Sequence, residues 1–316
     1  MCRDWNKLNT TGNSIDRLLF YIENIFMKKN ILVYISIFLV FTSCVTTNKN
    51  TDLDFLSDFN AETLVTDEIQ FTIINDSAEY ALLENKTYRQ KVHLVKINLL
   101  SENIKLEAYP NETVSYSLKN GRKYFTPVST KDFAKKQNAF AAINTTPFEY
   151  KNIFSKRTIC GTHKASGNEY GIIENRYCAL CFNCKGEDRK LISECRIIRN
   201  QTETELEKYD FCFGGFFVIL ENGCVEEKYK NIKDARVAAG LADGGKVLYL
   251  MEVEGGTFSK FCGLSYSDCA KIFKALGCSD AMQFDGGNSS QLVLEGRTLS
   301  KVFMRVKQAA FLGFSH

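Results

Sequence analysis

Proline and histidine are scarce in this chain of 316 residues, with 3 of each. The chain also lacks low-complexity tracts and any repeat of about 20–50 residues, which argues against a repeat architecture. Lys and Arg number 40 against 37 for Asp and Glu, and the net charge of +3 includes no dense basic block. This charge balance argues against nucleic acid as the main partner.

The composition is that of an ordinary globular protein. Hydrophobic residues make up 45% of the chain and charged residues 24%, which is enough to bury a sizeable core. The length allows one large domain or two small ones.

The first apolar run predicts export. Lys28 and Lys29 precede the apolar residues 31–41, and small residues then lead to Cys44. This run is shorter than the roughly 20 residues that a membrane-spanning helix needs. The pattern resembles a bacterial lipoprotein signal in which Cys44 becomes the lipidated first residue, although Phe41 stands where the usual pattern has Leu. An N-terminal core segment is the alternative.

This interpretation divides the chain into four parts. Residues 1–26 are an upstream artefact of start-codon choice, residues 27–43 the signal peptide, residues 44–67 a polar tether and residues 68–316 the folded domain. The mature protein would then lie in the bacterial cell envelope, lipid-anchored to a membrane and facing the periplasm or the surface.

Twelve cysteines are many for a cytosolic protein. Ten remain when Cys2 and Cys44 are set aside, and an even number in an exported chain favours disulfides. The spacing Cys178-x-x-Cys181-x-x-Cys184 leaves a zinc or iron–sulfur site open, and buried free thiols are a third alternative.

Alternating and apolar segments predict a strand-rich domain with few helices. Strands are expected at residues 91–98, 104–109, 139–143, 216–220, 236–241, 247–253, 281–284, 291–294 and 309–314. Helices are expected at residues 130–138, with Thr130 as N-cap, and at 266–276, with Ser265 as N-cap and Asp268 in a capping box. Residues 151–210 are expected to be strands and loops. The fold class is therefore α+β, a mixed strand-rich domain with a few helices packed on the sheets.

The most informative motif follows a short apolar run. Residues 281–284 end at Asp285-Gly286-Gly287-Asn288-Ser289-Ser290, which combines a carboxylate with two glycines and two hydroxyls. Glycine tolerates positive φ and lets backbone N–H groups approach a ligand closely. A carboxylate beside such groups suits a sugar or phosphate-bearing substrate, whereas a tight turn capped by Asp285 is the alternative.

From residue 236 onward the chain resembles the phosphodiester glycosidase family, and weaker similarity extends over about residues 68–314. The motifs that carry the resemblance are Arg236-Val-Ala-Ala-Gly240, Glu254-Gly255-Gly256, Asp285-Gly286-Gly287 and, earlier in the chain, Ala142-Ile143-Asn144 and Gly214-Gly215. Asp-Gly-Gly-x-Ser-Ser after a helix capped by serine is the most specific part.

The resemblance implies hydrolysis of the bond between a sugar's anomeric carbon and a phosphodiester. The substrate would be similar to an N-acetylglucosamine-1-phosphodiester, and the phosphomonoester would leave as a stable anion with little help from an acid. We expect Asp285 to act as base or nucleophile, Glu254 as second carboxylate and Arg236 as a bidentate phosphate clamp, with a salt bridge as the alternative for Arg236. Further substrate contacts are expected at Asn144, Gly215, Gly255, Gly286, Gly287, Ser289 and Ser290.

Two motifs depart from the family pattern. Asn144-Thr145-Thr146-Pro147-Phe148 stands where the family usually has Asn-Gly-Gly-Phe-Phe, and Glu254-Gly255-Gly256 stands where it often has Asp-Gly-Arg. These departures bear on substrate identity more than on fold. Two other functions therefore stay open: a non-catalytic glycan-binding surface lipoprotein with a decayed site, and a phosphodiesterase that cuts the P–O bond.

No cofactor and no catalytic metal are expected. His93, His163 and His316 lie outside the matching motifs, which argues against metal hydrolysis through histidine ligands. A structural Ca²⁺ held by Asp and Glu oxygens is left open. The expected partners are a sugar-phosphate or glycan substrate and, through the lipid anchor, a membrane.

Lipid modification of Cys44 is testable in cells. We expect a mature chain that begins at Cys44 and carries at least two acyl chains, because one chain alone anchors a protein only marginally. Metabolic palmitate labelling should mark the wild-type protein and leave a Cys44→Ala variant unmarked, and globomycin should block processing. A soluble, unlabelled chain that begins at Met1 would contradict the prediction.

Overall fold

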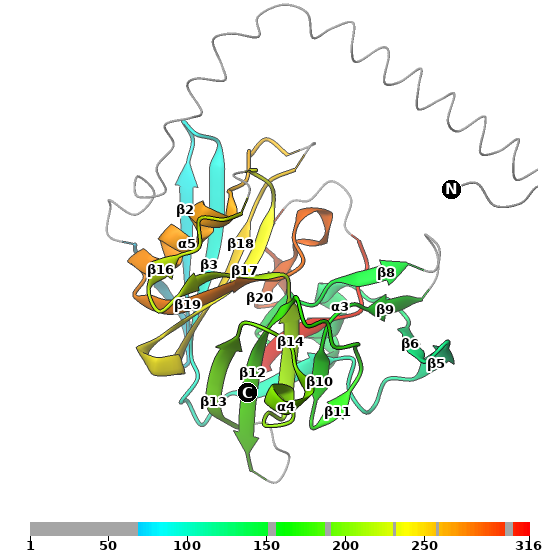
Figure 1. Cartoon of the computed structure of the whole chain (residues 1–316). Coiled ribbons are helices and arrows are strands. Elements are labelled where there is room, and N and C mark those ends of the chain that lie inside the picture. The colour runs from blue at the N-terminus through cyan, green and yellow to red at the C-terminus, as the bar shows by residue number, and fades with distance from the viewer. Residues whose placement is uncertain (1–68, 151–155, 187–190, 230–231, 257–258, 301–305) are drawn as a thin grey trace, which may run out of the picture. The chain divides into compact units, whose positions relative to one another are not determined.

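The computed structural model of the chain describes residues 69–150, 156–186, 191–229, 232–256, 259–300 and 306–316 (Figure 1). Cys44 and the expected segments 1–26, 27–43 and 44–67 lie outside these described residues. Within the described ranges, no helix is both long and apolar enough to span a membrane.

The largest sheet has eight strands, and each pairs antiparallel with its neighbours. In spatial order they are β1 (Thr72–Asn75), β2 (Ala78–Asn85), β3 (Gln90–Asn98), β18 (Val247–Val253), β17 (Arg236–Ala242), β19 (Cys278–Gln283), β15 (Phe217–Glu221) and β16 (Cys224–Val225). We call it the large sheet. Strands from both ends of the chain meet in it, as the cyan β2 and β3 beside the yellow β18 show (Figure 1).

Three smaller sheets contain the other strands. The first is ordered β21 (Arg297–Thr298), β20 (Leu292–Leu294), β7 (Ala141–Asn144), β22 (Phe311–Ser315) and β4 (Lys105–Tyr109). The second is ordered β11 (Asn168–Glu169), β10 (His163–Ala165), β14 (Phe211–Gly215), β12 (Cys178–Lys185) and β13 (Leu191–Ile198). The third is ordered β5 (Tyr116–Lys119), β6 (Arg122–Phe125), β9 (Arg157–Ile159) and β8 (Phe148–Tyr150).

The helices are short and well capped. They are α3 (Thr130–Gln137), α4 (Glu203–Leu206), α5 (Tyr266–Ala275) and the 3-10 turns η2 (Asp243–Gly245) and η3 (Gly287–Ser289). The N-cap of α3 is Ser129, which accepts from the Asp132 N–H at 3.0 Å, so the expectation of Thr130 as N-cap is wrong by one residue. The expected capping box of α5 is confirmed, with Ser265 and Asp268 each accepting from the other's backbone N–H.

Side-chain alternation gives the large sheet two apolar faces. One face packs into the main core shared with the smaller sheets, and it includes Val95, Val237 and Leu250. The other face packs against α5, and it includes Leu94, Ala238 and Met251. A helix thus covers one face of the large sheet and strands cover the other. The described structure is mostly β with few helices, which is compatible with the expected α+β class.

The expected disulfides are not found. All ten cysteines of the described residues are free, and six of them are buried. Burial raises the pKa of the Cys178 thiol, which keeps it protonated. The three-residue spacing along β12 also separates the cysteines, because Cys178 and Cys184 lie on one face of the strand and Cys181 on the other. No group of three metal-binding side chains gathers within the described part of the chain.

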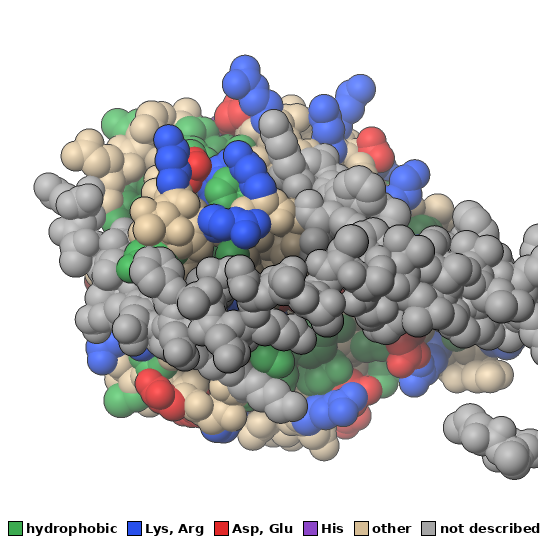
Figure 2. All heavy atoms as spheres, turned by 90° about the horizontal axis from the view of Figure 1, so that it is seen from above, with side chains coloured by type: hydrophobic (Ala, Val, Ile, Leu, Met, Phe, Trp, Pro, Cys, Tyr) green, Lys and Arg blue, Asp and Glu red, His purple; other side chains and the backbone are tan. Residues whose placement is uncertain are grey.

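Charges of both signs share the surface. On the face shown in Figure 2, Lys and Arg side chains are interspersed with Asp, Glu and hydrophobic ones. Exposed ion pairs such as Arg122–Glu149, with 2.7 Å between Nη1 and Oε2, are worth little stability because water screens them. Folding therefore depends mainly on the buried faces of the sheets.

The contribution of the α5 capping box to stability can be tested by mutation. Ser265→Ala removes the hydroxyl that accepts from the Asp268 N–H, so we expect the free energy of unfolding to fall by about 1 kcal/mol. Urea denaturation would measure the change. Ser117→Ala, at an exposed position of β5, is the matched control and should stay within about 0.5 kcal/mol of wild type. Equal effects of the two variants would contradict the prediction.

Candidate active site

The turn that carries Asp285 leaves the large sheet and attaches to another. β19 ends at Gln283, and the Phe284 N–H still donates to the Val237 carbonyl at 2.8 Å. The Asp285 N–H donates instead to the Thr145 carbonyl, 2.9 Å away and one residue beyond β7. The expected buried strand before the motif is confirmed, and backbone bonds fix the turn to two sheets.

Asn144 ties the same turn to β7 through its side chain. Its Nδ2 donates to the Asp285 carbonyl at 2.7 Å, and its Oδ1 accepts from the Gln291 N–H at 2.9 Å. The residue is fully buried, so both ends of its amide are used inside the protein. The sequence predicts Asn144 as a substrate contact, whereas the structure places it as a support of the Asp285 turn.

The Asp285 carboxyl sits in a poorly solvated environment. Its burial raises its pKa from 3.8 to about 6, and a hydrogen bond with the Ser289 side chain only partly opposes this shift. Ser289 ends η3, and the Gln308 side-chain amide donates to its carbonyl. A carboxyl with a pKa near neutrality is a better proton acceptor than an ordinary aspartate, which suits a general base.

A cavity of about 240 Å³ lies beside this turn. Carboxyl, guanidinium, amide, aromatic and glycine groups surround it. Its lining residues are Phe216, Asp234, Arg236, Tyr266, Gln283, Phe284, Asp285, Gly286 and Gly287. The structure thus brings together Asp285, Arg236 and both glycines of the motif, and we call this cavity the Asp285 pocket.

Main-chain carbonyls and an aromatic ring fix the Arg236 guanidinium. Nε donates to the Leu264 carbonyl at 3.0 Å, and Nη2 donates to the Ile232 carbonyl at 2.5 Å. The guanidinium carbon lies 4.0 Å from the centre of the Tyr266 ring, a cation–π contact. No carboxylate of the described residues forms an ion pair with Arg236, so a salt bridge does not account for it. Its Nη1 group and one N–H of Nη2 remain for a ligand.

Asp234 is a second carboxylate of the Asp285 pocket, and it lies outside the motifs that the sequence singles out. Its Oδ1 accepts from the Ala235 N–H at 2.7 Å. Its backbone forms two hydrogen bonds with Leu264, of 3.2 and 3.1 Å. Because residues two apart in an extended segment point to the same side, its position two residues before Arg236 is the signal that could have identified it.

Glycines bring three other segments against the backbone of Asp234 and Ala235. A Cβ would lie 2.6 Å from the Ala235 nitrogen at Gly255, 2.2 Å from the Asp234 carbonyl oxygen at Gly263 and 2.9 Å from the Ala235 carbonyl oxygen at Gly286. Side chains at these positions would displace the Asp234 segment. Gly255 and Gly286, which the sequence predicts as substrate contacts, therefore also serve as packing positions that fix Asp234.

Gly215 has a packing role. A Cβ there would lie 2.3 Å from the Gln283 carbonyl oxygen, so this glycine lets the end of β14 approach the end of β19. It is buried and is not among the described residues that line the Asp285 pocket. The structure therefore gives no support to the prediction of a direct substrate contact at Gly215.

Glu254 lies on the opposite face of the large sheet from Arg236. Arg236 is paired with Val253, which packs against α5, so alternation turns Glu254 to the other face. There its Oε1 lies 2.9 Å from Lys91 Nζ and 3.1 Å from His93 Nε2. Burial opposes ionisation of Glu254, but hydrogen bonds from His93 and Lys91 outweigh it and lower the pKa to about 2. Because Glu254 is absent from the described lining of the pocket, this geometry does not support it as the second catalytic carboxylate.

His93 links Glu254 to Tyr80. The Tyr80 hydroxyl lies 2.8 Å from Nδ1 of the imidazole, and burial together with the charges of Glu252 and Glu254 raises the pKa of Tyr80 to about 12. Tyr80 therefore stays a neutral hydroxyl. The network anchors the end of β18, and sequence spacing alone does not reveal it because its members lie far apart in the chain.

Several buried polar atoms beside the turn have no oxygen or nitrogen hydrogen-bond partner among the described residues. They are Thr145 Oγ1, Gln283 Nε2, Ser290 Oγ and Gln308 Oε1. Buried polar groups in folded proteins are nearly always satisfied by protein, water or ligand, so these atoms are candidates for contact with water or a small polar ligand. Ser290 thus keeps a free hydroxyl, whereas Ser289 uses its side chain on Asp285.

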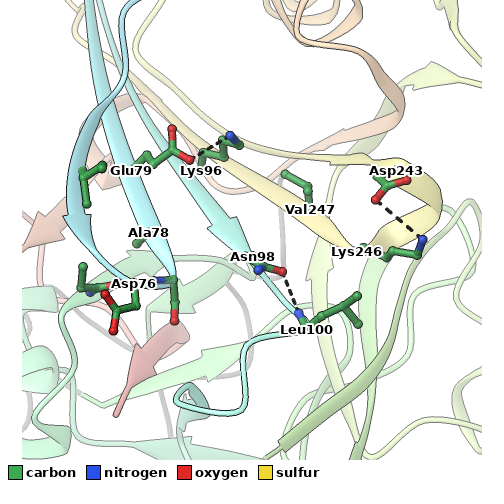
Figure 3. A pocket seen from close by; sticks show the side chains of 12 residues that line it. Asp76, Ala78, Glu79, Lys96, Asn98, Leu100, Asp243, Lys246 and Val247 are labelled. Carbon is green, nitrogen blue, oxygen red and sulfur yellow. Dashed lines mark hydrogen bonds and ion pairs between the residues drawn. The ribbon is translucent and has the colours of Figure 1, made fainter.

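A larger hollow, of about 480 Å³, lies at the other end of β18 (Figure 3). Its two cations are already paired. Lys96 Nζ lies 2.9 Å from Glu79, and Lys246 Nζ lies 3.7 Å from Asp243. None of the site residues predicted from the sequence lines this hollow among the described residues, so its size does not make it a rival site.

Comparisons with known proteins agree with the motifs. The sequence model of the phosphodiester glycosidase family matches residues 171–309. A search of curated proteins finds no match. Two solved structures show that the fold is shared, and at their low identity they show no more than that.

The first is the crystal structure of a hypothetical protein from Synechocystis, with a TM-score of 0.57 and 14% identity over 78% of this chain and 63% of that one. This chain therefore spans less than two thirds of the Synechocystis protein. The second is the catalytic domain of zebrafish N-acetylglucosamine-1-phosphodiester α-N-acetylglucosaminidase, auto-inhibited by its pro-peptide, with a TM-score of 0.53 and 15% identity over 79% of this chain and 88% of that one. The family model confirms the resemblance that the Asp285 motif carries. It matches residues 171–309 of this chain.

Proposed function

We propose that this protein hydrolyses the anomeric C–O bond of a sugar-1-phosphodiester, similar to an N-acetylglucosamine-1-phosphodiester. The observation that carries the proposal is the Asp285 pocket, which places a carboxyl with a raised pKa and a fixed guanidinium in one cavity. The family match over residues 171–309 supports the same reaction class.

In this reaction Asp285 acts as general base. It takes a proton from a water molecule whose oxygen forms a bond to the anomeric carbon. The bond between that carbon and the phosphate oxygen breaks, and its electron pair leaves with the phosphate. A free sugar and a phosphomonoester result. Because the phosphate anion is a good leaving group, the reaction needs little acid assistance.

The rest of the Asp285 pocket suits the two halves of such a substrate. The remaining N–H groups of Arg236 bind phosphate oxygens, and a guanidinium suits them because it offers two donors in one plane. Phe216 and Tyr266 are aromatic residues of the lining, and such residues suit the apolar side of a sugar. Gly287, at a φ of 58°, brings backbone to the cavity without a side chain.

We also propose that the protein acts in the bacterial cell envelope as a lipid-anchored enzyme, on a sugar-phosphate or glycan substrate. The signal-like residues 27–43 and Cys44 support this location. The proposed reaction requires no cofactor, since water, a carboxylate and a cation supply its chemistry. A glycan-binding lipoprotein without activity remains the competing function, and the changes at Thr145 and Gly256 favour it.

Removal of the Asp285 charge tests the reaction. Asp285→Asn keeps the shape of the side chain but removes the base, so we expect the rate of sugar release to fall by at least ~10². Arg236→Lys should also weaken activity, because an ammonium cannot present two N–H groups in a plane. Release of reducing sugar from a panel of sugar-1-phosphodiesters gives the measurement. Asp243→Asn, at an exposed turn, is the control and should match wild type.

Three results would count against this assignment. Activity of Asp285→Asn within a few-fold of wild type would show that Asp285 is not the base. Incorporation of labelled water oxygen into phosphate instead of sugar would show P–O cleavage and favour a phosphodiesterase. Glycan binding without cleavage of any substrate in the panel would favour the non-catalytic lipoprotein.

The raised pKa of Asp285 also predicts a cost in stability. Between pH 3.8 and about 6 the folded state binds more protons at this group than the unfolded state, so stability falls as pH rises through this window and stays reduced above it. Asp285→Asn removes this cost, and we expect it to stabilise the protein by about 3 kcal/mol at pH 8 and by roughly half as much at pH 5. Urea denaturation at both pH values, with Asp243→Asn as control, measures it. A gain that does not change with pH would contradict the expectation.

A further inference from the structure

We propose that Asp234 and Gln283 form the part of the Asp285 pocket that recognises the sugar residue of the substrate, by hydrogen bonds to its hydroxyl groups. This inference rests on the proposed function, because it names the role of two residues in the same cavity. Neither residue belongs to the catalytic pair Asp285 and Arg236.

Asp234 offers an acceptor that the protein leaves unused. Its Oδ1 holds the Ala235 N–H at 2.7 Å, whereas its Oδ2 accepts no hydrogen bond from any described residue. Oδ2 lies 3.7 Å from the place that a Cβ would take on Gly287, another lining residue. The free oxygen is therefore beside the turn that carries Asp285.

Gln283 offers a donor that no oxygen or nitrogen acceptor of the described residues uses. The residue is only 1% exposed. Its side-chain amide contacts the Cys269 thiol on α5, which is a weak acceptor. A ligand group that accepts from this amide would therefore offer it a stronger hydrogen bond than the thiol does.

One free acceptor and one free donor in the same cavity match a polyol, since each sugar hydroxyl can donate and accept. A phosphate would not suit Asp234, because two negative groups repel. The cavity volume of about 240 Å³ is smaller than the roughly 300–1,000 Å³ of sites for drug-sized ligands, so it suits one sugar residue with its phosphate rather than a longer glycan. The aromatic rings of Phe216 and Tyr266 complete such a site.

The packing around Asp234 indicates that its place is fixed before a ligand arrives. Gly255, Gly263 and Gly286 come from three separate segments, and each approaches the Asp234–Ala235 backbone more closely than any Cβ would allow. Preorganised polar groups bind more tightly because no ordering cost is left to overcome. This arrangement separates Asp234 from a surface aspartate that is merely solvated.

Calorimetry with two probes tests the proposal. N-acetylglucosamine 1-phosphate carries the sugar and the phosphate, and inorganic phosphate carries only the anion. Asp234→Asn keeps an oxygen for the Ala235 N–H but replaces Oδ2 with a donor and removes the charge. We expect it to weaken binding of the sugar phosphate by about 10-fold or more and to leave phosphate binding equal or tighter. Gln283→Met should likewise weaken only the sugar phosphate.

Arg236→Lys is the matched contrast and should weaken both probes, whereas Asp243→Asn should change neither. A melting temperature of Asp234→Asn close to that of Asp243→Asn shows that its fold is intact. Equal loss of both probes in Asp234→Asn would indicate a structural role and overturn the proposal. Unchanged sugar phosphate affinity in that variant, or no binding of this probe by the wild-type protein, would also overturn it.

The outcomes for hydrolysis are separate. Cleavage of a sugar-1-phosphodiester with unchanged sugar affinity in Asp234→Asn would overturn the sugar site and leave the hydrolase intact. Binding that depends on Asp234 without any cleavage would overturn the hydrolase and leave the sugar site intact.

Discussion

The two hydrogen bonds of the Asn144 amide are the constraint on which the Asp285 pocket depends. β19 lies in the large sheet and β20 in another, so the eight residues between them must cross from one sheet to the other. Asn144 holds this connection near both of its ends, as donor to Asp285 and as acceptor from Gln291. An aspartate could not donate the hydrogen bond to Asp285, and a leucine could form neither bond. This position therefore requires a side-chain amide. The Asp285 carboxyl is thereby placed by hydrogen bonds to the backbone of its turn.

Electrostatics then give two carboxyls of this region opposite properties. Asp285 is half-buried, its carboxyl is poorly solvated and no cation of the described residues forms a hydrogen bond with it, so its pKa rises to about 6. Glu254 is buried with Lys91 and His93 beside it, and its pKa falls to about 2. Burial alone acts in the same direction on both groups, so their partners decide the result. Asp285 can therefore exchange a proton near neutral pH, while Glu254 remains a permanent anion that anchors the end of β18.

Much of this could be predicted from the sequence, and the failures have physical reasons. Periodic apolar segments located the strands of the large sheet and α5, and the glycine-rich motif located the Asp285 turn. The face of the sheet on which Glu254 lies could not be predicted, because it depends on strand register. Arg236 pairs with Val253, so the residue after Val253, Glu254, must point to the opposite face. His93 was missed for another reason. Its contacts with Glu254 and Tyr80 join segments distant in sequence, which no local pattern reports.

The departures at Thr145 and Thr146 have a structural interpretation. The backbone of Thr145 accepts from Asp285 and donates to Ala310, and neither bond requires a glycine. The methyl group of Thr146 packs against β14, 3.0 Å from where a Cβ on Gly214 would lie. The hydrogen bonds that support the Asp285 turn are therefore kept. Beside the turn, Thr145 adds a hydroxyl and Thr146 adds a methyl group where the family pattern has glycines. These departures therefore leave the Asp285 turn in place and alter only its surroundings.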